Sequence, residues 1–305
     1  MGLLRRHLYL LAAEHKKYPM TGDVLTLGQQ SVHAPLNEVM SLFKQQDVFL
    51  KELPAGFDTK NKIPDWKGTK YGHYTNCQAV AMLLGAQKVY AADVSTYENP
   101  DIVMDFSLPV DKKYYNAFDV ILDVGTLEHI FDISTALENI RLMTKPGGII
   151  ILGTWTSGAI NHGFYQICPT LFYDYFTKNS FDDINCFMLV GSALNYEKKA
   201  AIYQCKKPAM IQDLTFNSKT GIETMFFARK KVSSTENPKM QSPIQSYYLA
   251  SPYWNRSPIP SKTKSPVKEI IAWLVFITRK WRPEFIDMIW KAIKTKKNLI
   301  YRGRY

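Results

Sequence analysis

Three residues that could serve acid–base chemistry, together with one glycine, lie at the end of one apolar stretch of the chain. The segment FDVILDV at 118–124 runs directly into GTLEH, which brings Asp123, Gly125, Glu128 and His129 close together in the sequence. Histidine exchanges protons near neutrality, carboxylates accept hydrogen bonds, and glycine lets a ligand approach the backbone. The pattern indicates a polar corner that could bind a polar ligand and move a proton.

The elements around this corner form one strand–helix–strand unit. Val120, Ile121 and Leu122 are consecutive, which is typical of a parallel strand that is buried on both faces. Apolar residues from Thr135 onward recur at helical spacing, and KPGG at 145–148 ends that helix before the apolar segment GIIIL. Ligands of open parallel sheets bind beyond the carboxyl ends of the strands, so the corner lies where a substrate is expected.

At these residues the chain resembles the class I S-adenosylmethionine-dependent methyltransferases, in particular the type 11-like branch that acts on bacterial glycans and small molecules. The resemblance rests on LDVGTLEHIFD, TKPGG and NHGFYQICPTLFYDYF, and covers roughly residues 20–230. It implies an α/β fold with a doubly wound, seven-stranded Rossmann-like methyltransferase sheet and a C-terminal helical appendage. The apolar segments that we interpret as its strands are 24–30, 88–95, 102–107, 118–124, 148–152, 183–196 and 221–230.

The resemblance also implies S-adenosylmethionine as the cofactor and assigns residues to it. Asp93, at the end of the second strand, takes the ribose role, and Asp105 in IVMDFS takes the adenine-side role. Each is also explained as an aspartate that stabilises its own turn. Asp123 and Gly125 are expected to shape the methionine and acceptor side of the pocket.

The first glycine motif departs from the family pattern. The family usually carries several glycines there, whereas LTLGQQSVH contains Gly28 alone. Gly28 and Gln29 are the residues expected to contact the cofactor, and Gln29 or Gln30 would need to turn outward to leave room. A homologue that no longer turns over therefore stays an alternative.

Two pairs of residues are candidates for contacting the acceptor. Glu128 and His129 are neighbours, so at a helix start they point about 100° apart and only one is expected to act as the base. His129 has the better pKa for that role, although a packing histidine is the alternative, and Glu128 could accept a hydrogen bond. His162 and Tyr165 form the second pair, with core aromatics as the alternative. No metal is expected, because the spacing of Glu128, His129 and His162 matches no recognised ligand pattern.

Composition is that of a globular protein with an uneven charge distribution. Of 305 residues, 46% are hydrophobic and 13% aromatic, which is ample for a buried core. The net charge is +11, but residues 262–305 carry 12 Lys or Arg and 3 acids, a balance of +9 that leaves +2 for the remainder. The four cysteines contain no CxxC pair, which favours reduced thiols in a cytosolic protein.

We divide the chain into three parts. Residues 1–231 form the methyltransferase-like domain, with an insertion at 51–73 that could cover the pocket. Residues 232–265 read as a Ser- and Pro-rich linker, and 266–305 as a basic, amphipathic helical tail. No transmembrane segment is expected, because the longest apolar run, at 270–277, is well below the roughly 20 residues that span a bilayer.

The function predicted from these observations is methyl transfer to an oxygen of a sugar, a glycan or another small molecule. The alternative is a catalytically degenerate methyltransferase-like scaffold that is targeted by its basic tail. Nucleic acid is disfavoured as a partner, because the positive charge lies in the tail and not around the pocket loops. The expected location is cytoplasmic, and the tail over 266–305 either packs on the domain or makes peripheral contact with the inner membrane surface.

Overall fold

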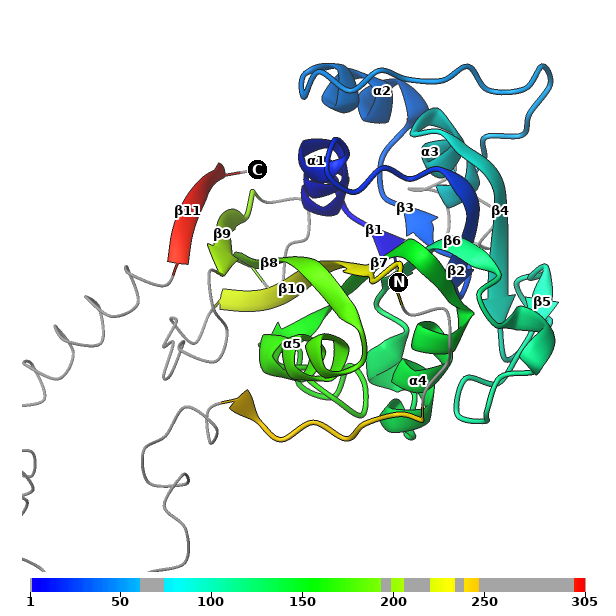
Figure 1. Ribbon diagram of the computed structural model, residues 1–305. Helices are drawn as coiled ribbons and strands as arrows, with labels where there is room; N and C mark the ends of the chain where they lie inside the picture. Colours follow the sequence, from blue (N-terminus) through cyan, green and yellow to red (C-terminus); the bar gives the residue numbers. More distant parts are fainter. Residues whose placement is uncertain are drawn as a thin grey trace, which may run out of the picture.

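The structure is a computed structural model that describes residues 2–60, 74–192, 199–205, 220–233, 239–246 and 299–304. Its centre is a mixed sheet with the strand order β11-β9-β8-β10-β7-β6-β2-β4-β5 (Figure 1). A second, two-stranded sheet joins β1 to β3 in parallel. The strands are β1 (Gly2–Leu3), β2 (Gly22–Leu27), β3 (Ser31–Val32), β4 (Ala86–Asp93), β5 (Ile102–Val103), β6 (Phe118–Val124), β7 (Thr144–Ser157), β8 (Phe181–Ser192), β9 (Ala201–Cys205), β10 (Thr220–Lys230) and β11 (Leu299–Arg304).

Helices cover both faces of the central sheet. In Figure 1, α1, α2 and α3 lie on one face, and α4 and α5 lie on the other. The helices are α1 (Arg5–Glu14), α2 (Leu36–Lys44), α3 (Cys77–Leu83), α4 (Ile133–Met143) and α5 (Pro169–Lys178), with the 3-10 turns η1 (Lys112–Tyr114) and η2 (Leu127–His129). This arrangement confirms the doubly wound α/β fold expected from the sequence.

The core explains why β6 reads as a continuous apolar run. Val120 and Leu122 belong to the cluster that α1, α2 and α3 cover, whereas Ile121 belongs to the cluster under α4 and α5. Successive side chains of a strand point to opposite faces, so the middle of a strand between two helical layers is apolar on both faces. Both clusters are buried, and together they fix the central strands.

Each of the seven expected strands is present in the described part of the chain. Strands β5, β4, β2, β6 and β7 run parallel, and β10 and β8 follow as antiparallel neighbours. The structure adds β9 and β11 beyond β8. It also begins β7 at Thr144, directly after α4, so KPGG lies inside the strand, where Gly147 adopts a φ of +78°.

The expected insertion and tail are described in part. Lys60 and Thr75 form an antiparallel bridge, so the insertion leaves and rejoins the domain at one place, while 61–73 lie outside the described residues. Most of the expected helical tail, 266–298, also lies outside them. The described end of the tail differs from the expectation, because residues 299–304 form β11, which pairs with the edge strand β9. Pairing of backbone groups along an open strand edge explains the strand.

Part of the expected linker packs against the domain. The Gln241 backbone N–H donates to Asn179 Oδ1 at 2.9 Å, and Asn179 Nδ2 donates to the Gln241 carbonyl at 2.9 Å. The Ser246 backbone N–H donates to Asp174 on α5 at 2.8 Å. Residues 239–246 therefore follow the domain surface beside α5.

Two further expectations concern thiols and membrane spans. All four cysteines lie in the described part and are free. Within the described residues, no helix has the length and apolar character needed to cross a bilayer.

Candidate functional site at the carboxyl edge of the sheet

Gly28 marks the switch point of the sheet. It follows β2, whose two neighbours are β4 on one side and β6 on the other. Its φ is +70°, and its N–H donates to the Ala92 carbonyl at 2.7 Å. A Cβ at this position would lie 3.3 Å from Thr126 Oγ1 and 3.5 Å from Asp93 Oδ2. Three elements thus meet at a backbone position with no side chain, and such switch points are where open α/β sheets bind ligands.

Asp93 ends β4 and is half-buried beside Gly28. Its Oδ1 accepts the Ser95 backbone N–H at 2.9 Å, which closes the turn after the strand. The other oxygen, Oδ2, would lie 3.5 Å from a Cβ placed on Gly28. One carboxylate oxygen therefore orders the turn, and the other faces the switch point.

Asp105 lies just beyond β5, the neighbour of β4, and is exposed. Its Oδ1 accepts hydrogen bonds from Ser107 N at 2.8 Å and Ser107 Oγ at 2.6 Å. These bonds lower the pKa of the Asp105 carboxyl. The geometry is that of an aspartate turn at the same edge of the sheet as Asp93, so the adenine-side role stays a prediction.

Gln29 and Gln30 do not turn toward solvent, with exposed fractions of 8% and 3%. Gln78 Nε2 on α3 donates to Gln29 Oε1 at 3.3 Å. Gln30 Nε2 donates to the Leu27 carbonyl at 2.6 Å, and its Oε1 is buried without a hydrogen-bond partner among the described residues. The side chains fold back onto the protein, which holds the loop after β2 in one conformation.

Asp123 supports the turn after β6 from beneath. It is fully buried, its Oδ1 accepts Thr126 N at 3.0 Å, and its Oδ2 accepts Leu127 N at 3.2 Å. Burial, together with the nearby Glu128, raises the pKa of Asp123 to about 8. Gly125 has a φ of +93° and donates its N–H to the Gly153 carbonyl at 2.9 Å. Both residues shape the corner through the backbone.

Glu128 is fully buried at the start of η2. Its Oε2 accepts the Thr154 hydroxyl at 3.0 Å, whereas Oε1 is buried with no hydrogen-bond partner among the described residues. Burial raises the pKa of Glu128 to about 7. Sequence reasoning missed Thr154, which sits near the end of β7 and carries no motif of its own.

His129 and His162 approach each other across the corner. Their rings lie 5.0 Å apart, centroid to centroid, in an edge-to-face arrangement, and Trp155 lies 6.3 Å from His162. Burial lowers the pKa of both histidines, with His162 adding to the effect at His129. Near neutrality both imidazoles are therefore neutral and able to accept a proton.

Tyr165 anchors the loop after β7. Its hydroxyl donates to the Phe131 carbonyl at 2.7 Å, and its N–H donates to the Glu128 carbonyl at 3.2 Å. The rings of Phe131 and Phe164 are 5.5 Å apart, and both side chains are exposed. The structure thus brings Glu128, His129 and His162 to one corner and holds the loop of Tyr165 against it. Their contact with an acceptor stays a prediction.

A buried ion pair holds α1 near this corner, and sequence reasoning missed it. Arg6 forms two hydrogen bonds of 2.6 Å with Glu223 on β10, and His7 Nε2 lies 3.0 Å from the same carboxylate. Glu223 is the register partner of Trp155 at the end of β7. Glu223 lies more than 200 positions after Arg6 and His7, so no local pattern points to the contact.

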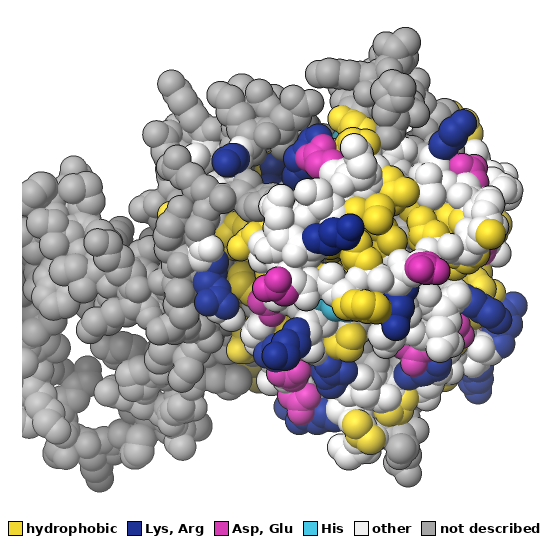
Figure 2. Space-filling model, turned by 90° about the horizontal axis from the view of Figure 1, so that it is seen from above, with side chains coloured by type: hydrophobic (Ala, Val, Ile, Leu, Met, Phe, Trp, Pro, Cys, Tyr) yellow, Lys and Arg dark blue, Asp and Glu magenta, His cyan; other side chains and the backbone are white. Residues whose placement is uncertain are grey.

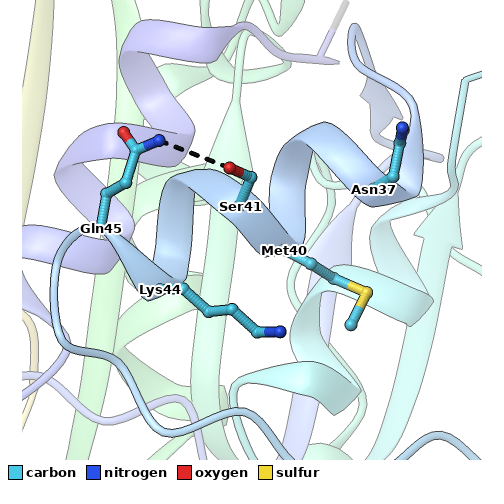
Figure 3. A pocket seen from close by; sticks show the side chains of 5 residues that line it. All are labelled: Asn37, Met40, Ser41, Lys44 and Gln45. Carbon is cyan, nitrogen blue, oxygen red and sulfur yellow. Dashed lines mark hydrogen bonds between the residues drawn. The ribbon is translucent and has the colours of Figure 1, made fainter.

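A shallow hollow elsewhere is formed by one helix. Asn37, Met40, Ser41, Lys44 and Gln45 of α2 and its end line it, and Gln45 donates to Ser41 at 3.4 Å (Figure 3). None of the predicted site residues lines this hollow. On the face seen from above, hydrophobic side chains form a band, with Lys, Arg, Asp and Glu interspersed around it (Figure 2).

Comparisons with known proteins give structural likeness only. No protein-family model matches the sequence, and no curated protein is similar to it at a significant level. The solved structures with similarity include the YcgJ protein from Bacillus subtilis, with 10% identity, a TM-score of 0.39 and coverage of 74% of this chain and 99% of that one. The trans-methyltransferase CalH in complex with SAH has 12% identity, a TM-score of 0.34 and coverage of 73% and 54%. A SAM-dependent methyltransferase from Archaeoglobus fulgidus has 9% identity, a TM-score of 0.35 and coverage of 73% and 94%. At these scores the likenesses do not assign an activity to this chain.

Proposed function

We propose that this chain is an S-adenosylmethionine-dependent methyltransferase that methylates an oxygen of a sugar, a glycan or another small molecule. The observation that carries the proposal is the meeting of Gly28, Asp93 and Thr126 at the switch point. A left-handed glycine after the first central strand and a carboxylate after its neighbour suit a nucleoside-containing cofactor.

The residues at the switch point fit the two ends of that cofactor. Asp93 Oδ2 is available to accept the ribose hydroxyls, while Oδ1 keeps its turn closed. Asp105 is assigned to the adenine side, and Gly28 with Gln29 to the methionine side. When bound, the cofactor supplies a methyl group that is already activated on a sulfonium, so the protein must chiefly position the acceptor and exclude water.

Proton removal from the acceptor is assigned to the histidine pair. His129 and His162 are both partly exposed beside the buried Glu128, and burial lowers the pKa of each. A neutral imidazole can take the proton of an acceptor hydroxyl as the oxygen attacks the methyl carbon. We therefore assign proton removal to the imidazoles, next to which the buried carboxylate of Glu128 lies.

The rim of the corner favours a ring-bearing acceptor. Phe131, Ile160 and Phe164 are exposed by 73%, 81% and 66%, and Phe131 and Phe164 contact each other. Exposed aromatic rings beside polar groups are suitable platforms for sugar rings and other flat ligands. A glycan or small-molecule acceptor fits this rim better than a nucleic acid, because the chain outside residues 262–305 carries a charge balance of only +2.

The basic tail is assigned to membrane contact. Its charge balance of +9 over 262–305 suits an anionic lipid surface, and a membrane-attached acceptor would then lie close to the domain. The corresponding location is the cytoplasm, at the inner membrane surface. Residues 266–298 of the tail lie outside the described residues, so this assignment rests on the sequence.

A catalytically degenerate scaffold is the second candidate. The observation that favours it is the inward packing of Gln29 and Gln30, which stand where the family carries small glycines. If these side chains occupy the space needed by the methionine part of the cofactor, the protein would keep its fold but would not transfer methyl groups. Cofactor binding with turnover separates the two candidates.

Calorimetric titration with S-adenosylmethionine and S-adenosylhomocysteine tests the proposal. We expect the wild type to bind both, Asp93→Ala to bind at least about 10-fold more weakly, and Asp23→Ala to match the wild type. Loss of one charge-assisted hydrogen bond is worth that factor. Asp23 lies at the opposite end of β2, so it controls for the loss of a strand-end aspartate. No binding by the wild type would make the scaffold the better account.

A further inference from the structure

Three side chains of metal-binding type converge at the corner. One oxygen of Glu128 and one nitrogen each of His129 and His162 all lie within 4.8 Å of one another. His129 is adjacent to Glu128 in sequence, whereas His162 comes from the loop between β7 and α5. The convergence is therefore a product of the fold and not of sequence spacing.

The buried carboxylate of Glu128 is oriented so that one of its oxygens could bind a metal ion. Thr154 donates to Oε2 at 3.0 Å and fixes the plane of the group. The other oxygen, Oε1, lies 3.9 Å from His162 Nε2 and has no hydrogen-bond partner among the described residues. A fully buried oxygen without a partner is costly unless something else binds it. A cation between Oε1 and the imidazoles would satisfy it.

The loop that carries His162 is held against Glu128 by its backbone. A Cβ at Gly163 would lie only 2.6 Å from the Glu128 carbonyl oxygen, so only glycine allows this approach. Two residues later, Tyr165 N–H donates to the same carbonyl at 3.2 Å. These contacts place His162 next to Glu128 through the fold, which explains why the spacing of the three residues matches no recognised ligand pattern.

We propose that Glu128, His129 and His162 bind a first-row divalent transition metal ion such as Zn²⁺ or Mn²⁺. Two imidazoles and one carboxylate suit such ions better than Mg²⁺ or Ca²⁺, which prefer oxygen ligands throughout. Metal–ligand bonds of about 2.0–2.2 Å bring ligand atoms to about 3.0–3.5 Å from one another, so the exposed imidazoles must close in by about 1 Å. Rotation of their side chains provides that movement.

A bound ion would have coordination positions left for an acceptor. Three protein ligands leave at least one open position, and His129 and His162 are the exposed members of the set. An acceptor oxygen at that position would be polarised and easier to deprotonate, so with an ion bound the acceptor hydroxyl would be activated by the ion and not by free imidazoles. This consequence rests on the proposed function, whereas ion binding itself does not.

Metal titration of the full-length protein, freed of metal with a chelator, tests the proposal. We expect calorimetry to show one Zn²⁺ or Mn²⁺ per chain, with Mg²⁺ at least about 100-fold weaker. His162→Ala and Glu128→Gln should each weaken Zn²⁺ binding by at least about 100-fold, since even the loss of a supporting residue costs 10- to 100-fold. His15→Ala, a histidine outside the cluster, should bind like the wild type.

Two further variants separate this proposal from others. Gly163→Ala keeps every ligand but pushes the loop from Glu128, and we expect about a 10-fold loss of Zn²⁺ affinity. Asp93→Ala should keep metal binding even if cofactor binding is lost, so failure of the proposed function and failure of the metal site are distinguishable. The proposal is overturned if the wild type binds no transition metal, or if His162→Ala binds it as tightly as the wild type does. His162 is exposed, so that variant is expected to fold.

Discussion

At the scale of single residues, Gly28 offers the sharpest test of the cofactor site. Its φ of +70° strains any other residue, and a Cβ would contact Thr126 Oγ1 and Asp93 Oδ2. We expect Gly28→Ala to lower the free energy of unfolding by about 1–2 kcal/mol and to weaken S-adenosylmethionine binding at least about 10-fold. Urea unfolding and calorimetry measure the two effects.

Gly56→Ala is the matched control for that prediction. Gly56 has a φ of +75°, but a Cβ there would meet nothing within 4 Å. Both substitutions should therefore lower the free energy of unfolding by a similar amount through backbone strain, whereas only Gly28→Ala should lose cofactor affinity. Equal cofactor affinity in the two variants would mean that the space beside Gly28 is not used by the ligand.

The sequence could predict some site residues but not their contacts. Gly28 and Asp93 lie at the ends of two neighbouring parallel strands of the sheet that the family resemblance implies, so their proximity follows from the fold. The inward packing of Gln29 depends on Gln78, which lies 49 positions later on α3. The approach of His162 to Glu128 depends on a backbone contact at Gly163. Contacts of this kind are set by packing between distant segments, which periodicity does not report.

At the scale of elements, the buried Arg6–His7–Glu223 contact fixes α1 to β10. The Leu4 N–H donates to His7 Nδ1 at 3.2 Å, so Nε2 is left to face the Glu223 carboxylate at 3.0 Å. Burial acts to raise the pKa of Glu223, but His7 and Arg6 outweigh burial and lower it to about 2. The contact therefore keeps a buried carboxylate ionised.

A pH dependence of stability follows from that shift. The folded-state pKa lies below the ordinary value of 4.5, so the native state holds fewer protons than the unfolded state between these values. The contribution is complete above about pH 4.5 and disappears as the pH falls toward 2, a loss on the order of 3 kcal/mol. Urea unfolding between pH 2 and pH 6, in roughly unit steps, measures it.

Glu223→Gln isolates this contribution. The variant removes the buried carboxylate that Arg6 and His7 contact, and we expect a loss of about 3–5 kcal/mol at neutral pH. Its unfolding free energy should also fall less steeply than that of the wild type below pH 4.5. Glu38→Gln is the control, because Glu38 pairs with Arg5 of the same helix at a partly exposed position. If the unfolding free energies of the wild type and Glu223→Gln change in parallel with pH, ionisation of Glu223 does not cause the acid destabilisation.

Elements were more predictable than residues. Each of the seven expected strands is present, and Asn76 caps α3 by accepting the Ala79 N–H at 2.7 Å. Strands β9 and β11 were not predicted, because each becomes stable through pairing with a neighbour and not through its own pattern. The short apolar LIY segment at 299–301 has no periodicity that separates strand from helix.

At the scale of the whole molecule, charge is divided between domain and tail. The domain is close to neutral, and on the face shown in Figure 2 its charged side chains are intermixed. The tail carries a balance of +9 over 262–305. If the tail contacts anionic lipid, the domain contributes little to the attraction, and binding must depend on salt and on tail lysines.

Substitution of tail lysines tests that dependence without removing β11. We expect Lys291, Lys294, Lys296 and Lys297, all changed to Gln, to weaken binding to anionic vesicles at least about 10-fold, because each basic residue near the surface contributes about 1 kcal/mol. Lys88, Lys112 and Lys113, changed together in the domain, should have little effect, and neutral vesicles should bind neither protein. Cosedimentation at low and high salt measures this. Unchanged binding in the tail variant would mean that the tail's charge serves packing or solubility, and the acceptor would then be sought among soluble molecules.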